Sequence, residues 1–212
     1  MQLLSVNIGT AQIMQIGDDS VSTGIYKRAT PDLVQVSKQG LAGDVIGNQS
    51  DHGGSDQAIY LYSAEDYSWW SQELGVDLEP GVFGENLTLY GFGDALLKIG
   101  DQLQIGSVRL ELTAPRIPCS RLAARMGDPT FVKRFTRARR PGSYARVIQP
   151  GSVRVGDTIE VHPALEPYPT IVEFSIFWGS HEKHPDEIKR YLDAPIAQRA
   201  RAKLEGLLRE QA

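Results

Sequence analysis

Short runs of alternating apolar and polar residues, separated by glycines, dominate the first 161 positions of the chain. Segments 11–16 and 21–26 flank a Gly-Asp-Asp sequence that is typical of a hairpin turn, and segments 33–36 and 108–113 alternate in the same way. Period-two alternation bounded by turn residues is the pattern of half-buried β-strands. This part of the chain is therefore predicted to be mainly β.

One pattern occurs twice. Segments 97–105 and 153–161 both run as strand, Gly-Asp turn and strand, with the turns at Gly100-Asp101 and Gly156-Asp157. We interpret both segments as hairpins at related places in a closed or nearly closed β-barrel.

Two helices are predicted beside the strands. Ser63 is a candidate N-cap, and Gly75 a candidate stop, for a helix with apolar residues on one face. Segment 129–140 is also predicted to be helical and carries five basic residues. Its basic face either is simply solvated or lies at the rim of a site around the cysteine described below, and the pattern leaves both open.

The composition changes after residue 161. Residues 162–169 contain three prolines and are predicted to form a linker, and Thr170 and Glu173 have the spacing of a helix capping box. The remaining chain, residues 170–212, is predicted to form a small module of three short helices at residues 171–178, 185–192 and 195–209. So short a module has little core of its own, so we expect it to dock on the barrel or on a partner.

Composition and charge narrow the function classes. The 212 residues are 41% hydrophobic and 23% charged, with a formal net charge of −4, which argues against a binder of nucleic-acid polymers or anionic membranes. No apolar run approaches the ~20 residues that span a bilayer, and the N-terminus does not resemble a secretory signal. A single cysteine is typical of reducing compartments, so a cytoplasmic protein is expected.

Cys119 is the only cysteine and lies in an unusual frame. Pro115 and Pro118 stiffen the chain around it, and Arg116 and Arg121 place positive charge on both sides. Nearby cations favour the thiolate, the form that binds metals and attacks electrophiles. A cysteine can equally be a small buried hydrophobic residue, and this segment alone leaves both readings open.

A second candidate is the long segment 38–56, which contains five glycines and no sustained periodicity. Long loops in compact domains are often functional. Within it, Gly53 and Gly54 follow His52, and their backbone can reach positive φ and form an anion-binding nest. The alternative is a tight turn before a strand at residues 58–62.

Five stretches in this order resemble the MOSC family, the domain named after molybdenum cofactor sulfurases, and within it the YiiM-like subgroup. They are Lys38 to Asp44, His52 to Ala58, Phe83 to Leu87, Pro115 to Cys119 and Gly142 to Asp157. The resemblance implies a mainly β, α+β fold: a MOSC-type β-barrel at residues 1–161 with peripheral helices, followed by a three-helix module at residues 170–212.

The resemblance also implies a cofactor, the molybdenum cofactor (a molybdenum–pyranopterin), which can be absent from purified protein. By motif position, Cys119 is expected to be the catalytic residue and the metal ligand, because a thiolate suits a soft metal site. The residues expected to bind the cofactor are Lys38, His52, Gly53, Gly54, Asn86, Arg116 and Arg121.

Two functions are compatible with this resemblance. The first is a molybdenum-dependent reductase of N-hydroxylated small molecules, such as hydroxylaminopurines, that receives electrons from a separate flavoprotein or iron–sulfur protein. The second is a molybdenum cofactor carrier or sulfur-transfer module without reductase activity. The resemblance is to stand-alone proteins without an attached pyridoxal-phosphate desulfurase domain, which favours the first function, and a homodimer is left open.

Overall fold

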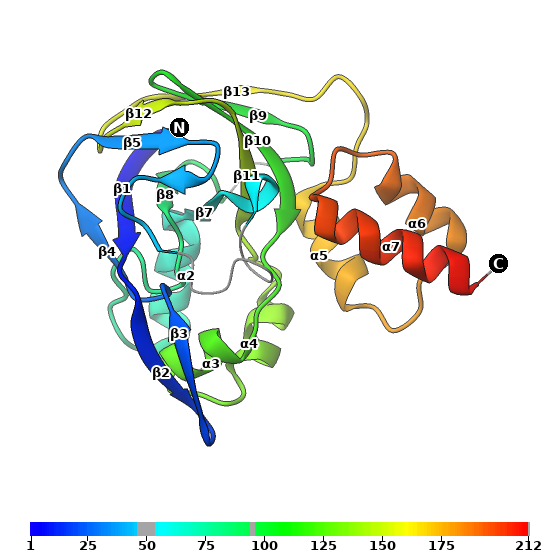
Figure 1. Cartoon of the computed structure of the whole chain (residues 1–212), viewed down its shortest axis with the longest axis horizontal. Helices are drawn as coiled ribbons and strands as arrows, with labels where there is room; N and C mark the ends of the chain where they lie inside the picture. Colours follow the sequence, from blue (N-terminus) through cyan, green and yellow to red (C-terminus); the bar gives the residue numbers. More distant parts are fainter. Residues whose placement is uncertain (46–53, 94–95, 212) are drawn as a thin grey trace.

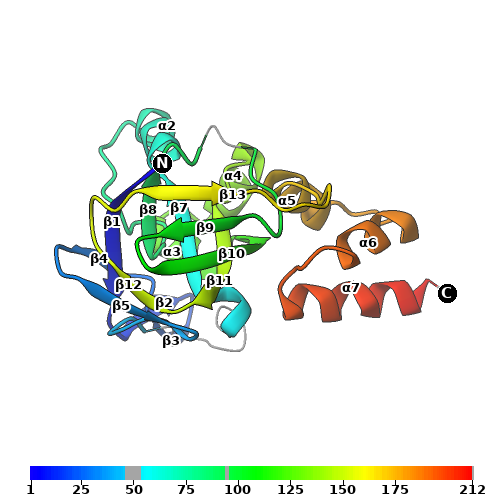
Figure 2. The same ribbon diagram turned by 90° about the horizontal axis from the view of Figure 1, so that it is seen from above.

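The computed structural model describes residues 1–45, 54–93 and 96–211. A curved sheet forms the body of the molecule, three helices lie at one end of it, and a compact helical module lies beside it (Figures 1 and 2). The large sheet has eight strands in the spatial order β13 (Ile159–His162), β9 (Gln102–Ile105), β10 (Val108–Pro115), β11 (Ser143–Gln149), β7 (Ile59–Ser63), β8 (Leu87–Tyr90), β1 (Gln2–Gly9) and β4 (Lys27–Thr30).

Neighbouring strands of this sheet are antiparallel except β7 and β8, which are parallel. Two smaller sheets accompany it. One consists of β12 (Gly151–Val153), β5 (Val34–Ser37) and β6 (Gly40–Leu41), and the other is the hairpin of β2 (Gln12–Ile16) and β3 (Asp19–Thr23).

The large sheet curls back on itself. The amide of Leu3 donates to the carbonyl of Asp157 at 2.9 Å, and the amide of Gly156 donates to the carbonyl of Leu3 at 2.8 Å. These bonds join the start of β1 to the turn before β13. The predicted α+β fold class is confirmed, although the sheet is strongly curved rather than a fully closed barrel and helices make up a larger share than a mainly β chain has.

The helices are α2 (Ala64–Leu74), α3 (Ser120–Met126), α4 (Phe131–Ala138), α5 (Ile171–Gly179), α6 (Pro185–Leu192) and α7 (Gln198–Glu210), and a short 3-10 helix, η1 (Ser55–Gln57), precedes β7. The predicted caps of α2 are confirmed: the Ser63 hydroxyl accepts from the amide of Asp66, and Gly75 ends the helix at φ 69°. Among the described residues, no helix is long and apolar enough to cross a membrane.

The repeated Gly-Asp pattern gives two equivalent turns but not two hairpins. In each turn the aspartate accepts the amide three residues earlier: Asp101 from Lys98 at 2.8 Å and Asp157 from Arg154 at 2.9 Å. The hairpin prediction is wrong because the residues before each turn pair elsewhere. Lys98 forms a bridge to Thr170, and β12 pairs with β5, while β9 and β13 pair with each other.

A single hydrophobic core joins the sheet to the C-terminal module. Buried leucines of β9 and β10 belong to the same cluster as Phe174 of α5, Tyr191 of α6 and Leu204 of α7. The expectation that the module docks on the barrel is therefore confirmed. A second cluster is rich in aromatic residues and attaches α2 and α4 to β7, with Trp70 stacked on Phe135 at 5.9 Å and bonded through its Nε1–H to the Tyr62 hydroxyl at 2.9 Å.

The start of the module yields a pH-dependent prediction. Thr170 and Glu173 form the predicted capping box, in which the Thr170 amide donates to the Glu173 carboxylate at 2.7 Å. That hydrogen bond holds the pKa of Glu173 below its ordinary value, against the opposing effect of burial. A lowered pKa stabilises the fold above the unfolded-state pKa, and the contribution is lost as pH falls through the folded-state pKa. Glu173→Gln should therefore lower the thermal midpoint modestly at neutral pH and not at acidic pH, measured by circular dichroism.

Glu182→Gln is the matched control, because Glu182 is an exposed glutamate outside the helices. A Glu173→Gln deficit of equal size at both pH values would contradict the assignment of this carboxylate as an ionised cap.

Candidate functional site

The cysteine is placed where a central strand ends. β10 finishes at Pro115, and Cys119 is the N-cap residue of α3, with extended backbone angles. In the sheet register, Ala114 of β10 lies opposite Tyr144 of β11, which lies opposite Tyr60 of β7. This row of strands aligns the cysteine segment with two tyrosine rings, and Cys119 is partly exposed rather than packed in the core.

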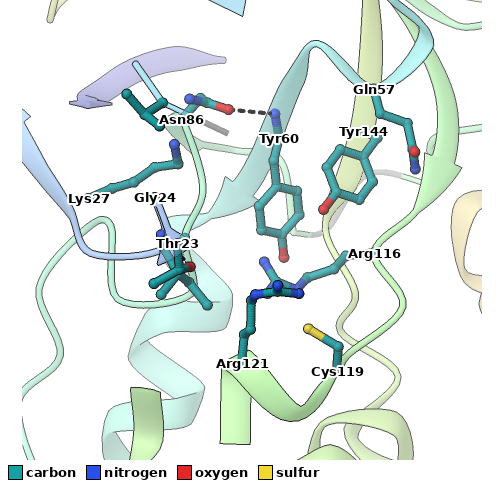
Figure 3. A pocket seen from close by; sticks show the side chains of 13 residues that line it. Thr23, Gly24, Lys27, Gln57, Tyr60, Asn86, Arg116, Cys119, Arg121 and Tyr144 are labelled. Atoms are coloured by element: carbon teal, nitrogen blue, oxygen red, sulfur yellow. Dashed lines mark hydrogen bonds between the residues drawn. The ribbon is translucent and has the colours of Figure 1, made fainter. Parts of the chain in front are cut away.

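Cys119 lines a small cavity of about 70 Å³, here called the inner cavity. Figure 3 shows the sulfur pointing towards the guanidinium groups of Arg116 and Arg121, with the two tyrosine rings above them. The polar side chains that line the inner cavity are those of Thr23, Lys27, Gln57, Tyr60, Asn86, Arg116, Cys119, Arg121 and Tyr144. Among its described lining residues are three cationic side chains and no carboxylate.

Arg116 is almost fully buried, with 6% of its surface exposed. Its Nη1 donates to the carbonyl of Phe83 at 2.6 Å, and its guanidinium carbon lies 5.0 Å from the centre of the Tyr60 ring. The buried Nε atoms of Arg116 and Arg121 have no hydrogen-bond partner among the described residues. A buried donor without an acceptor is costly, and an acceptor group on a ligand in the inner cavity would satisfy both of these donors.

Lys27 provides the third cation and is held by a polar network. Its Nζ contacts both carboxylate oxygens of Asp44, at 2.5 and 2.6 Å, and the same carboxylate accepts from Asn86 Nδ2 at 2.8 Å. The Asn86 Oδ1 accepts the amide of Tyr60 at 3.0 Å. Burial lowers the pKa of Lys27, while Asp44 opposes that effect. Asn86 therefore connects Lys27 to the tyrosine strand, with one of its N–H groups already used.

Both tyrosines at the cavity are neutral phenols at physiological pH. Burial raises the pKa of Tyr60 and of Tyr144, although the charge of Arg116 acts in the opposite direction on both. The Tyr60 hydroxyl donates to the carbonyl of Pro141 at 2.9 Å. The tyrosines thus contribute aromatic surface and neutral hydroxyls, and the cavity keeps its positive character.

A close backbone contact shapes the same cavity. A Cβ atom on Gly24 would lie 1.7 Å from the carbonyl oxygen of Val45, and both residues line the inner cavity. Gly24→Ala should therefore displace the chain at Val45, destabilise the protein by about 1–3 kcal/mol as overpacking does, and weaken ligand binding in the cavity. Chemical denaturation measures the first effect. Gly179→Ala, where the nearest heavy atom to the new Cβ is 3.8 Å away, is the control that should change neither.

The structure brings together four of the residues expected from the sequence: Asn86, Arg116, Cys119 and Arg121 all line the inner cavity. His52 and Gly53 lie outside the described residues, so the expectations for them stay predictions. Gly54 does reach a positive φ of 94°, but it lines a separate shallow cavity beside the start of α7.

Lys38 lies elsewhere. Its side chain is exposed, and its Nζ donates to the carbonyl of Ile148 at 2.9 Å. Lys27, and not Lys38, is the lysine that lines the described part of the inner cavity. The basic residues of α4 line neither the inner cavity nor the larger cavity described below. This favours the interpretation that the basic face of α4 is simply solvated.

Lys27, Tyr60 and Tyr144 are site residues that sequence reasoning missed. Tyr60 lies in the strand predicted at residues 58–62, but only the pairing of β7 with β11 shows that its ring and the ring of Tyr144 face one cavity. Lys27 is the first residue of β4, a strand with no clear alternating pattern. Nothing in the sequence indicates that the Lys27 side chain is buried.

A larger cavity of about 430 Å³, here called the outer cavity, adjoins the inner one. The two share Gln57, Cys119, Arg121 and Tyr144. The far wall of the outer cavity comes from the C-terminal module, through Phe174 and Trp178 of α5 and Arg199, Ala200 and Lys203 of α7. Cys119 thus lies where a small basic chamber opens into a wider space between the sheet and the module.

Comparison with known proteins identifies the family. The family model for the MOSC domain matches residues 48–160. The chain belongs to the MOSC domain family. It is 32% identical over 159 residues to the uncharacterized protein YflK of Bacillus subtilis, covering 75% of this chain and 72% of the relative. It is 27% identical to the protein YiiM of Escherichia coli, covering 74% of this chain and 70% of the relative.

A third relative is a longer protein. A protein named "Reductase" from Gibberella moniliformis is 34% identical over 172 residues, which cover 79% of this MOSC chain but only 30% of the fungal protein. Among solved structures, YiiM from Geobacillus stearothermophilus has a TM-score of 0.82 at 25% identity and covers 98% of both chains. The YiiM structure from Escherichia coli has a TM-score of 0.76 at 20% identity, covers 100% of this chain and 94% of that one, and shows the shared fold. The YiiM-like resemblance is thereby confirmed.

Proposed function

We propose that this MOSC protein binds the molybdenum cofactor at Cys119 and reduces N-hydroxylated small molecules. The observation that carries the proposal is the inner cavity itself. A partly exposed thiol faces two guanidinium groups whose buried Nε atoms have no acceptor among the described residues, and no carboxylate lines the described part of the cavity. A soft metal ligand beside unsatisfied cationic donors suits a metal bound to an anionic organic group.

The residues present fit that cofactor. The described residues contain no cluster of three or more histidine, cysteine, aspartate or glutamate side chains able to hold a metal ion. A metal bound at Cys119 would therefore draw its other ligands from outside this set, as the dithiolene of a pyranopterin provides them. Arg116 and Arg121 would donate to anionic or carbonyl groups of the pyranopterin, and Lys27, whose charge Asp44 balances, would offer a further N–H donor.

When bound, the cofactor would supply the change of metal oxidation state that reduction of an N–O bond requires. The reaction takes up two electrons and two protons, breaks the N–O bond and releases water. The electrons would come from a separate flavoprotein or iron–sulfur protein. Arg116 and Arg121 would orient the bound group, and the neutral Tyr144 hydroxyl at the edge of both cavities would donate a hydrogen bond to the substrate.

The relatives support the proposal only in general terms. One of them is named a reductase, and two have names that state no activity. The identity of the substrate therefore rests on the chemistry of the site and on the family resemblance.

The test uses protein purified from a host that makes the molybdenum cofactor. Molybdenum analysis and pterin fluorescence should show both in comparable amounts, and a reduced dye should support reduction of a hydroxylaminopurine. Bound pterin without reduction of any N-hydroxylated compound, together with transfer of the cofactor to an acceptor enzyme, would instead establish the carrier function. Absence of both molybdenum and pterin from wild-type protein made in that host would contradict the proposal.

A further inference from the structure

The outer cavity has a chemical character of its own. Its volume of about 430 Å³ is within the range of small-molecule sites, and its described lining residues include three cationic side chains, Arg121, Arg199 and Lys203, and no carboxylate. Lys203 Nζ lies 5.0 Å from the centre of the Trp178 ring. This cation–π contact holds the ammonium group at the cavity wall, where it can meet an anion.

The pKa values of two neighbouring groups, Lys183 and Tyr144, respond to the positive charge around the outer cavity. Lys183, in the connection between α5 and α6 of the same module, has its pKa lowered by burial and then by the charge of Lys203. The charge of Arg199 acts on the Tyr144 hydroxyl and opposes the effect of burial on its pKa. Arg199 and Arg121 are therefore cations on opposite walls of one space that also contains Tyr144.

The rest of the lining is apolar. Pro115, Ile117 and Pro118 of the cysteine segment form one side, and Phe174 and Trp178 of α5 face them from the module. The Trp178 ring is only partly buried and packs edge-on against Phe174 at a centroid distance of 5.8 Å. Such surfaces bind a flat apolar body through contact area, while the cations bind a negatively charged group.

We propose that the outer cavity is a binding site for a small organic anion that has a planar ring and a phosphate or carboxylate group. The ring would lie between the proline segment and Trp178, and the anionic group would be bound by Lys203 and Arg199. If the proposed function is correct, this anion is the substrate, and its N-hydroxylated end reaches Cys119, which both cavities share.

The position of the cavity residues along the chain indicates that the outer cavity binds a substrate rather than the cofactor. The MOSC family model ends at residue 160, whereas Trp178, Arg199 and Lys203 all lie beyond it. A cofactor bound by the family domain should be held by residues of that domain. A wall supplied by the appended module is expected to select the substrate instead.

The first experiment measures binding and needs no turnover. Isothermal titration of the full chain with adenosine 5′-monophosphate and with adenosine should show that the phosphate tightens binding by about 10- to 100-fold, as charge-assisted contacts do. The double variant Arg199→Gln/Lys203→Gln should lose most of this preference and leave adenosine binding nearly unchanged. Lys189→Gln removes one charge from the exposed surface of α6 and should keep the preference. Equal binding of the two compounds, or an equal loss in the control, would overturn the inference.

The second experiment distinguishes a phosphate group of the substrate from the phosphate group of the cofactor as the anion that Arg199 and Lys203 bind. Pterin content should be the same in the wild type and the double variant, and a fall in the variant would assign the cations to the cofactor phosphate and overturn the substrate site. In dye-linked assays, the double variant should lose rate with an N-hydroxylated nucleoside 5′-phosphate and keep its rate with the free base. A phosphate preference in binding without any reduction would support the site and contradict the proposed function. Reduction without a phosphate preference would support the proposed function and contradict the proposed site.

Discussion

Cys119→Ser is expected to abolish reduction of N-hydroxylated compounds while the protein stays folded. The substitution changes one atom of a partly exposed residue at the start of α3, so the core is not disturbed. A hydroxyl is a much poorer ligand than a thiolate for a soft metal site. Because loss of an outer-shell partner of a metal typically costs about 10- to 100-fold, loss of the ligand itself should lower kcat/KM by more than about 100-fold.

The measurement compares steady-state kinetics with a reduced dye and thermal unfolding for three proteins: wild type, Cys119→Ser and Ser68→Ala. The last substitution removes a hydroxyl from an exposed position of α2 that lines neither cavity, and it should leave most of the activity. Activity that persists in Cys119→Ser would return this cysteine to a purely structural role. A carrier would instead show no reduction even in the wild type, and Cys119→Ser would lose delivery of the cofactor.

Arg116→Gln is expected to weaken retention of the cofactor by about one to two orders of magnitude, since a hydrogen bond to a charged group contributes about 1.5–3 kcal/mol. Glutamine keeps a polar side chain but removes the positive charge beneath the Tyr60 ring and the guanidinium donor to the Phe83 carbonyl. The loss should appear as a lower pterin content after purification, and it should be partly restored when the cofactor is supplied in excess.

The buried position of Arg116 requires two further variants. Arg116→Lys keeps the charge without the planar fork and should fall between wild type and Arg116→Gln in pterin content. Arg134→Gln removes a partly exposed arginine of α4 that pairs with Asp128 and lines neither cavity, and it should keep the wild-type content. If Arg116→Gln unfolds, Arg116→Lys decides the question. A folded Arg116→Lys with wild-type retention and a wild-type rate of cofactor loss would contradict the role of the guanidinium group.

Local sequence patterns predicted helices, caps and turns well where the signal comes from a few neighbouring residues. The caps of α2, the capping box at Thr170 and the β2–β3 hairpin follow from spacing alone, because each depends on contacts within a few residues. The strand β1 was not predicted, although it is one of the two longest strands, and neither was α3, which begins immediately after Cys119.

The site was predictable in part. The cysteine frame and the family motifs indicated Arg116, Arg121 and Asn86 around Cys119, and all of them line the inner cavity. Lys27 could not be predicted, because its place depends on the pairing of β4 with β1 and on a carboxylate 17 positions away along the chain. Contacts between distant strands set the register, and no local pattern encodes them.

The contribution of the C-terminal module to the wall of the outer cavity could not be predicted from the sequence either. The sequence indicated three helices, but not that Trp178 and Lys203 would face the cysteine segment across a cavity. Docking was decided by the common core of α5, α7 and β10, which joins residues more than 60 positions apart. Long-range packing of this kind therefore shapes the part of the site for which we propose substrate selection.

X-ray absorption at the molybdenum edge, on protein from a cofactor-competent host, tests most directly whether Cys119 binds molybdenum. If Cys119 is a ligand, wild-type protein has one more sulfur ligand at molybdenum than Cys119→Ser, or the variant retains no molybdenum at all. Equal molybdenum content with the same number of sulfur ligands in both proteins would contradict this assignment.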